Sequence, residues 1–312
     1  MVDTVGSDPA SGCDMKRHGF TLVELLVSLA IIGVMVGLSL AGIQRVRHAA
    51  AQLDCQNHLK QVALAGQNYH SAMHTLPPGC RTKNDPYLHM SWLTRLLPYL
   101  EQQAAYNDAL ADFKRQPLFS FPLDGHVNLA RPMKAFVCPL ADRSTGLASY
   151  VSMRPEPFPV AFTWYLGVSG TYSDKKDGVL FADGVVRMTD ITDGTSNTIM
   201  IGERPPSPDD RFGWWYVGAG QDVSSPGSAE YFLGAAELRR GFRLPMCEIG
   251  PHRFGPDRLD NLCGVLHFWS LHPNGANFAF ADGHVQFLSY AAADILPALS
   301  TRNSREVVGV PE

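Results

Sequence analysis

The sequence has little charge and no excess of positive charge. Asp, Glu, Lys and Arg make up 18% of the 312 residues, and 30 acidic residues against 26 basic residues give a net charge of −4. Domains that bind nucleic acid normally carry clustered basic residues, so we expect no nucleic-acid partner. The chain also lacks the P-loop, the dinucleotide-binding glycine pattern, the nucleophile elbow and the His-Glu-x-x-His zinc motif. We therefore predict that the protein is not an enzyme.

Long charge-free runs are rare as well, with one exception near the N-terminus. The mean hydropathy of −0.07 excludes a protein with many membrane helices. Residues 25–43, however, are nineteen consecutive residues without a charge. A bilayer core about 30 Å thick requires roughly 20 apolar residues in a helix. Because Lys16 and Arg17 precede this run, we expect a single span over residues 20–43, with residues 44–312 outside the cytoplasm, in the periplasm or at the cell surface.

One acidic residue, Glu24, lies at the start of this apolar stretch. A secretory signal peptide has an apolar region of only about 7–15 residues and a small-residue cleavage site after it, which this run does not match. A plain signal anchor is a second interpretation. The third interpretation depends on Glu24, because a carboxylate at membrane depth costs several kcal/mol and normally has a functional partner.

Residues 16–26, which read KRHGFTLVELL, resemble the N-terminal segment of type IV pilins and type II secretion pseudopilins. The resemblance implies that a prepilin peptidase removes a leader, residues 1–19, by cutting between Gly19 and Phe20. It further implies that the new amino terminus of Phe20 is methylated and that Glu24 pairs with the amine of a neighbouring subunit during assembly. The implied partners are the peptidase, other pilin-like subunits or copies of this chain, and membrane lipid.

Motifs farther along the chain extend the resemblance to about Leu288. They occur in the order expected for a family of pilin-like proteins of unknown function: CQNHLKQ from Cys55, NYH from Asn68, LPYLEQ from Leu97, Cys138-Pro139, ITDGTSNTI from Ile191 with Glu203, and SLHPNGAN from Ser270. Members of this family have a C-terminal histidine followed, after nine residues, by Asp-Gly. In this chain that element is His272, Asp282 and Gly283.

The segment from Asp193 to Glu203 has two interpretations. Asp193, Asn197 and Glu203 offer oxygen ligands of the kind that calcium prefers, although their spacing is not that of an EF-hand. The same residues fit an Asp-Gly turn that side-chain oxygens and amides cap. Calcium is therefore the candidate cofactor. Zinc at the C-terminal histidines has weaker support, because zinc sites normally use more closely spaced cysteine pairs.

The cysteines suit an exported domain. One of the six lies in the predicted leader, and five remain for up to two disulfides in an oxidising compartment. Cys247 and Cys263 are the first pair that we would assign, because the loop between them is short. A buried, apolar role for each cysteine is the alternative.

These patterns predict an α+β, pilin-like fold. Apolar residues recur at helical spacing beyond the charge-free run, and no proline occurs between Ile43 and Pro77, so we expect one long helix from Thr21 to His70. This helix should pack on an antiparallel sheet with long loops. We predict a membrane-anchored subunit of a pilus-like or secretion-associated fibre. The alternative is a monomeric, membrane-anchored binding protein for metal or carbohydrate, with Trp164, Trp214, Trp215 and Tyr216 as sugar-stacking candidates.

Overall fold

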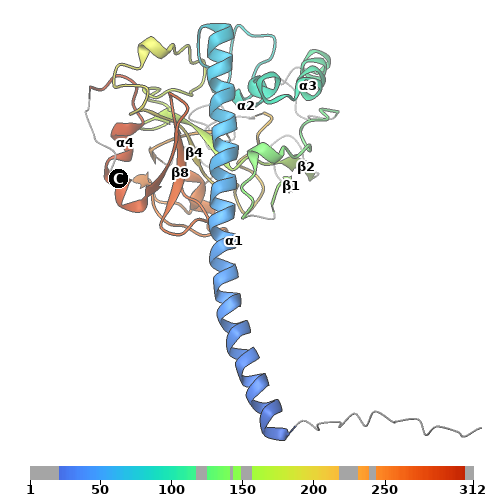
Figure 1. Ribbon diagram of the computed structural model, residues 1–312. Coiled ribbons are helices and arrows are strands. Elements are labelled where there is room, and N and C mark those ends of the chain that lie inside the picture. The colour runs from blue at the N-terminus through green and yellow to red at the C-terminus, as the bar shows by residue number, and fades with distance from the viewer. Residues whose placement is uncertain are drawn as a thin grey trace, which may run out of the picture. The chain divides into compact units, whose positions relative to one another are not determined.

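The computed structural model describes residues 21–116, 125–140, 143–148, 157–217, 231–238 and 244–305, without the side chains of residues 41 and 45 (Figure 1). The chain divides into two compact units, Met1–Arg47 and His48–Glu312. The helices are α1 (Leu22–Met73), α2 (Trp92–Leu96), α3 (Gln103–Arg115) and α4 (Leu296–Leu299), with 3-10 turns η1 (Leu97–Leu100), η2 (Lys134–Phe136), η3 (Met188–Asp190), η4 (Leu262–Leu266) and η5 (Tyr290–Asp294). The predicted division into leader, membrane segment and exported domain stays a prediction.

Helix α1 confirms the predicted long N-terminal helix. It begins after Thr21, whose backbone N–H and hydroxyl donate hydrogen bonds of 2.9 and 2.8 Å to Oε2 of Glu24. This contact caps the first turn, where backbone N–H groups have no partner within the helix. The helix ends at Met73, and His74 follows in the left-handed region with a φ of 59°. The Pro77-Pro78 pair then prevents further helical structure.

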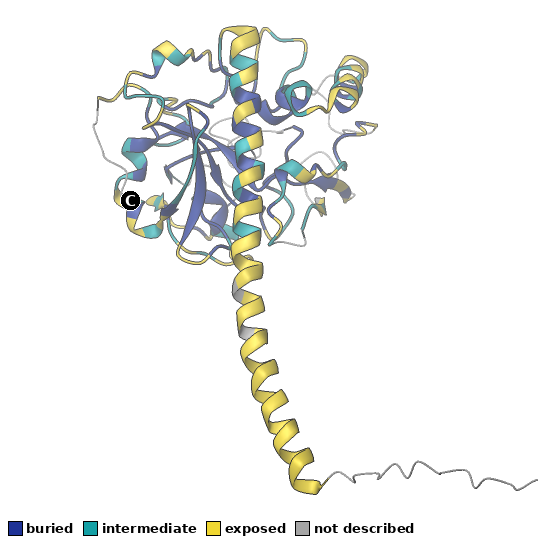
Figure 2. Cartoon of the chain, in the orientation of Figure 1, coloured by how far each residue is buried: buried dark blue, intermediate teal, exposed yellow. Residues whose placement is uncertain are grey.

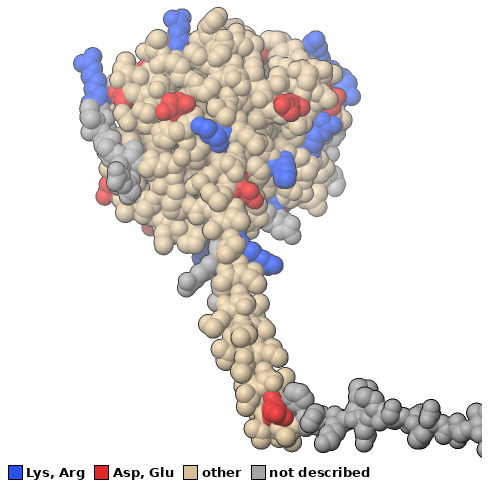
Figure 3. Space-filling view, viewed as in Figure 1, with Lys and Arg blue, Asp and Glu red and all other residues tan. Residues whose placement is uncertain are grey.

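In the first unit, α1 is apolar and exposed around its whole circumference. Its large apolar side chains, from Leu22 to Leu40, are each more than half exposed, and Figure 2 shows this segment in the yellow of exposed residues. Figure 3 shows that the same segment carries almost no charge, and Glu24 is its only charged residue between Thr21 and Ile43. The helix is thus long and apolar enough to cross a membrane.

The second unit contains a five-stranded sheet in the order β5-β3-β4-β8-β9. Only the β3–β5 pair is parallel, so the antiparallel character expected from the sequence is confirmed. Strands β1–β2 and β6–β7 form two small antiparallel sheets. The strands are β1 (Thr145–Ala148), β2 (Phe158–Ala161), β3 (Tyr165–Gly170), β4 (Ile199–Glu203), β5 (Phe232–Gly234), β6 (Ala236–Leu238), β7 (Pro251–Arg253), β8 (Gly275–Phe280) and β9 (Val285–Ser289).

The central strands are buried on both faces because a separate apolar core covers each side. Along β8, Phe278 and Phe280 belong to one core, whereas Ala279 belongs to the other. This alternation follows from the period of two in a strand. Helix α1 covers the second face with Leu59, Val62 and Ala63, and these positions are completely buried. The small side chains of β8 on this face leave room for the helix.

Candidate functional site

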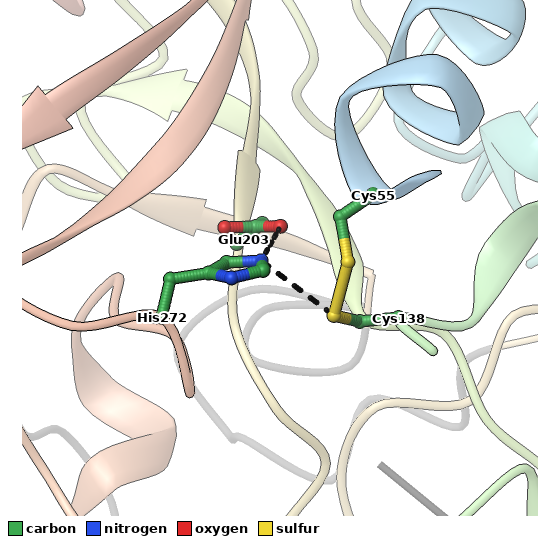
Figure 4. A group of neighbouring side chains, drawn as sticks. All are labelled: Cys55, Cys138, Glu203 and His272. Atoms are coloured by element: carbon green, nitrogen blue, oxygen red, sulfur yellow. Dashed lines mark hydrogen bonds and ion pairs between the residues drawn. A yellow bond between two sulfur atoms is a disulfide. The ribbon is translucent and has the colours of Figure 1, made fainter. Parts of the chain in front are cut away.

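Four side chains from distant parts of the second unit meet beneath α1. They are Cys55 of α1, Cys138 after η2, Glu203 at the end of β4 and His272 in the loop before β8 (Figure 4). One potential ligand atom from each residue lies within 4.8 Å of the corresponding atom of every other. All four residues are buried. We call this group the Cys-Glu-His cluster.

The strands bring polar side chains to the face that α1 covers. Tyr165 of β3 lies opposite Glu203 of β4 in the antiparallel ladder. Asn277 of β8 donates to Glu203 from its backbone N–H (2.7 Å to Oε2) and from its side-chain Nδ2 (3.1 Å to Oε1). These two donors hold the carboxylate on the helix-facing side of the sheet. A buried carboxylate requires such donors because it has lost its hydration.

Helix α1 closes over this row of strands through two further hydrogen bonds. Nε2 of Gln56 donates to Oδ1 of Asn277 at 3.0 Å, and the hydroxyl of Tyr165 donates to the backbone carbonyl of Cys55 at 3.2 Å. Burial, and then the negative charge of Glu203, raise the pKa of the Tyr165 hydroxyl well above its ordinary value. Tyr165 therefore remains a donor over the physiological pH range. The network fixes the position of Cys55 relative to Glu203.

Cys55 and Cys138 form a disulfide, with Cα atoms 5.2 Å apart. The pairing joins α1 to the segment that follows η2, across 83 residues of sequence. His272 lies against this bond, with its Nε2 3.7 Å from Sγ of Cys138 and 3.4 Å from Oε1 of Glu203. Nδ1 of the same ring makes no hydrogen bond with the described part of the chain. The imidazole is thus fully buried with only long polar contacts.

The structure places the predicted processing and assembly residues as follows. Gly19 and Phe20 lie outside the described residues. Glu24 lies in the first turn of α1, where its carboxylate accepts from Thr21. The roles of all three residues stay predictions.

The predicted C-terminal element separates in space. Asp282 and Gly283 form the turn between β8 and β9, where the N–H of Phe280 donates to His284 O at 2.9 Å. Gly283 has a φ of +87°, which is the backbone conformation that favours glycine at such a turn. His272 lies at the other end of β8, in the Cys-Glu-His cluster. Asp282 and Gly283 thus form a hairpin turn, whereas His272 lies away from that turn.

The residues proposed for calcium also belong to two places. Both carboxylate oxygens of Asp193 accept backbone hydrogen bonds, from Ser304 at 2.7 Å and Arg305 at 2.8 Å. Nδ2 of Asn197 donates to the Asp193 carbonyl at 3.2 Å. Glu203 lies at the far end of β4 and faces the cluster instead. Calcium binding at these residues stays a prediction, which titration calorimetry of the full chain at millimolar calcium would test.

A second disulfide joins Cys247 and Cys263, the pair that the short loop suggested. Cys80 is buried and belongs to neither of these two disulfides. Near the second disulfide, Nε2 of His267 lies 3.4 Å from Oδ2 of Asp257. Burial lowers the pKa of His267 to about 4, although the charge of Asp257 acts in the opposite direction. The imidazole is therefore neutral at physiological pH.

Sequence reasoning did not find the pairing of Cys55 with Cys138 or the approach of Glu203 to His272. Each residue belonged to a motif of the family resemblance, but the motifs are far apart in the chain. The available signal was that all four residues lie in motifs of the same family. A motif does not indicate, however, which other motif it contacts in the fold. The Cys-Glu-His cluster could therefore be recognised only from the tertiary structure.

A prepilin-type N-terminus followed by an α+β domain defines the chain as a pilin-like protein. Residues 14–40 match the prokaryotic N-terminal methylation motif, and residues 44–294 match the family described as "Protein of unknown function (DUF1559)". The second match covers most of the chain, so the protein belongs to that family. The comparisons with curated proteins and with solved structures found no match.

Proposed function

We propose that the protein is a membrane-anchored structural subunit that a prepilin peptidase processes and that assembles, with itself or with other pilin-like chains, into a pilus-like or secretion-associated fibre. In this proposal the peptidase cuts between Gly19 and Phe20. The second unit then lies outside the cytoplasm. The role is structural rather than catalytic, and the protein acts by assembly.

The observation that carries this proposal is the exposed apolar segment of α1, which coincides with the methylation motif. An apolar surface of this extent is stable only in lipid or against other apolar helices. Gly33 and Gly37 lie on this segment, and apart from the adjacent backbone of the helix itself no atom lies within 4 Å of the point where either would carry a Cβ. Small residues four positions apart allow helices to approach closely. The segment thus suits both a membrane and a bundle of like helices.

The contact between Thr21 and Glu24 suggests how the single chain stabilises the Glu24 charge within the apolar segment before assembly. Two donors from Thr21 satisfy one oxygen of the Glu24 carboxylate. Processing at Gly19 would place the amino terminus one residue before Thr21. The amine of a neighbouring chain would then supply the charge that this local cap lacks.

The carbohydrate-binding alternative receives no support from the four aromatic residues that suggested it. Trp164, Trp214, Trp215 and Tyr216 are at most 2% exposed. Their indole and phenol groups also form hydrogen bonds within the protein. For example, Nε1 of Trp215 donates to the Arg131 carbonyl at 2.8 Å. These rings are core residues and do not form a surface platform for a sugar.

The proposal is tested by N-terminal sequencing and cross-linking of the native protein from its membrane. We expect a mature chain that begins with methylated Phe20 and that cross-links into ladders. A Gly19→Val variant should retain its leader and remain outside the ladders, whereas the matched variant Gly42→Val, at a position with open space around it, should be processed normally. A wild-type chain that still begins at Met1, or that never cross-links to a pilin-like chain, would contradict the proposal.

A further inference from the structure

We propose that reduction of the Cys55–Cys138 disulfide converts the Cys-Glu-His cluster into a zinc site. The four ligands are the two cysteine thiolates, Nε2 of His272 and one carboxylate oxygen of Glu203. In the oxidised protein, the two sulfur atoms are bonded to each other and the site is closed to metal. The inference does not depend on fibre assembly.

The first argument is the spacing of the ligand atoms. In a tetrahedral zinc site, with zinc about 2.3 Å from sulfur and about 2.0–2.1 Å from nitrogen and oxygen, neighbouring ligand atoms lie roughly 3.3–3.8 Å apart. Nε2 of His272 lies 3.4 Å from Oε1 of Glu203 and 3.7 Å from Sγ of Cys138. These two edges of the tetrahedron are therefore already in place. The other ligand atoms also lie within 4.8 Å of one another, and the two sulfurs must separate to about 3.8 Å.

The second argument is the state of the His272 ring. Its side chain is 1% exposed, yet Nε2 makes no polar contact shorter than 3.4 Å and Nδ1 makes none with the described residues. Buried polar atoms normally have closer partners, because an unsatisfied one costs about 1–3 kcal/mol. A zinc ion among the four ligands would give Nε2 of His272 a partner at bonding distance.

The third argument is charge. With Glu203 ionised and His272 neutral, the oxidised cluster has a formal charge of −1. Zinc adds two positive charges and the two thiolates add two negative charges, so the loaded site has the same formal charge. The donors that Asn277 presents to Glu203 thus suit both states. They would also orient the carboxylate as a ligand, as hydrogen bonds to metal ligands generally do.

The reaction is a thiol–disulfide exchange followed by metal binding. A dithiol reductant attacks the disulfide through a mixed disulfide and leaves with its own sulfurs joined, having transferred two electrons and two protons to Cys55 and Cys138. Zinc then displaces the two thiol protons into solvent. Val137 and Pro139, on either side of Cys138, line a surface pocket of about 370 Å³. This pocket offers a reductant an approach to the Cys138 segment.

The second disulfide provides a matched control within the same unit. Cys247 and Cys263 are also joined, but in the described part of the chain they are not grouped with metal-binding side chains as the Cys-Glu-His cluster is. Reduction of this pair should therefore create no zinc site. Any zinc that binds because of general thiol affinity would appear at both pairs, or at Cys80.

The experiment uses the full chain in detergent micelles. A water-soluble phosphine reduces it without oxygen, the phosphine is removed, and zinc chloride is added before gel filtration. We expect about one zinc per chain in the reduced protein and none in the oxidised protein, by elemental mass spectrometry. Cobalt(II) in place of zinc should give the sulfur-to-cobalt absorption of a tetrahedral thiolate site. Circular dichroism reports the fold in each state.

Variants distinguish the site from adventitious binding. Cys247→Ser/Cys263→Ser should retain the zinc, and Cys55→Ser/Cys138→Ser should lose it. Asn277→Ala should weaken zinc binding about 10–100-fold while retaining the thiolate absorption, because the Asn277 side chain orients Glu203 and is not itself a ligand. Three results would overturn the proposal: no zinc in the reduced, folded chain; undiminished zinc in Cys55→Ser/Cys138→Ser; or unfolding on reduction, since the site requires the cluster to persist without its disulfide.

Discussion

His272 and Glu203 form a buried pair, with Nε2 of the imidazole 3.4 Å from Oε1 of the carboxylate and both side chains at most 3% exposed. Glu203 ends β4 and His272 lies in the loop before β8, and the Cys55–Cys138 disulfide lies against the imidazole. The pair therefore lies in a buried region beside the disulfide that joins α1 to the Cys138 segment.

Replacing Glu203 by Gln should destabilise the second unit. The variant keeps the shape of the side chain, but its amide nitrogen would face one of the two donors of Asn277. We expect the free energy of unfolding to fall by about 2–3 kcal/mol, as for other buried charged hydrogen bonds. Urea denaturation measures the change. The exposed Glu248→Gln control should stay within about 0.5 kcal/mol of wild type, and an equally stable Glu203→Gln protein would contradict the role assigned to the carboxylate.

The two disulfides should contribute unequally to stability. In the chain-entropy description, a disulfide reduces the conformational entropy of the unfolded chain and so raises its free energy. This increase is about 4.5 kcal/mol for a link across 83 residues and about 3 kcal/mol for a link across 16 residues. Cys55→Ser/Cys138→Ser should therefore lower the unfolding midpoint further than Cys247→Ser/Cys263→Ser does. Denaturation of the two double variants without metal makes the comparison. The reverse order would show that contacts other than loop closure dominate.

Acid should destabilise the fold partly through His267. Because burial lowers its pKa to about 4, the folded protein binds fewer protons than the unfolded chain between pH 6.5 and pH 4. The free energy of unfolding should thus fall as the pH falls through this window, by about 2–3 kcal/mol from this residue. His267→Asn should reduce this slope, while the exposed His74→Asn serves as the control for loss of an imidazole. An unchanged slope in His267→Asn would exclude His267 as its source.

Glu24 should matter for assembly and not for processing. Glu24→Gln retains an oxygen for the Thr21 cap but removes the charge that would attract the amine of a neighbour. We expect normal removal of residues 1–19 and loss of most cross-linked ladders. Thr21→Ala removes the hydroxyl of the cap alone and should assemble nearly as wild type does. If Glu24→Gln assembles normally, the carboxylate has no role in fibre formation.

The long helix and the β8–β9 hairpin follow from local sequence. Apolar residues recur at helical spacing and no proline occurs before Pro77, so the helix continues to Met73. In the hairpin, Gly283 of the Asp282-Gly283 pair supplies the positive φ that a tight turn requires. The short Cys247–Cys263 link was likewise suggested by proximity in the chain. In each case the interacting residues are close in sequence, so the local pattern contains the information.

The amino-acid sequence by itself determined the processing motif, the apolar segment of α1 and the α+β class, because each depends on periodicity or on a contiguous motif. Only the tertiary structure decided that Cys55, Cys138, Glu203 and His272 meet. Their approach depends on the antiparallel pairing of β3, β4 and β8 and on the face of α1 that packs against these strands. Long-range pairing of this kind results from burial of the whole core, to which no single motif corresponds.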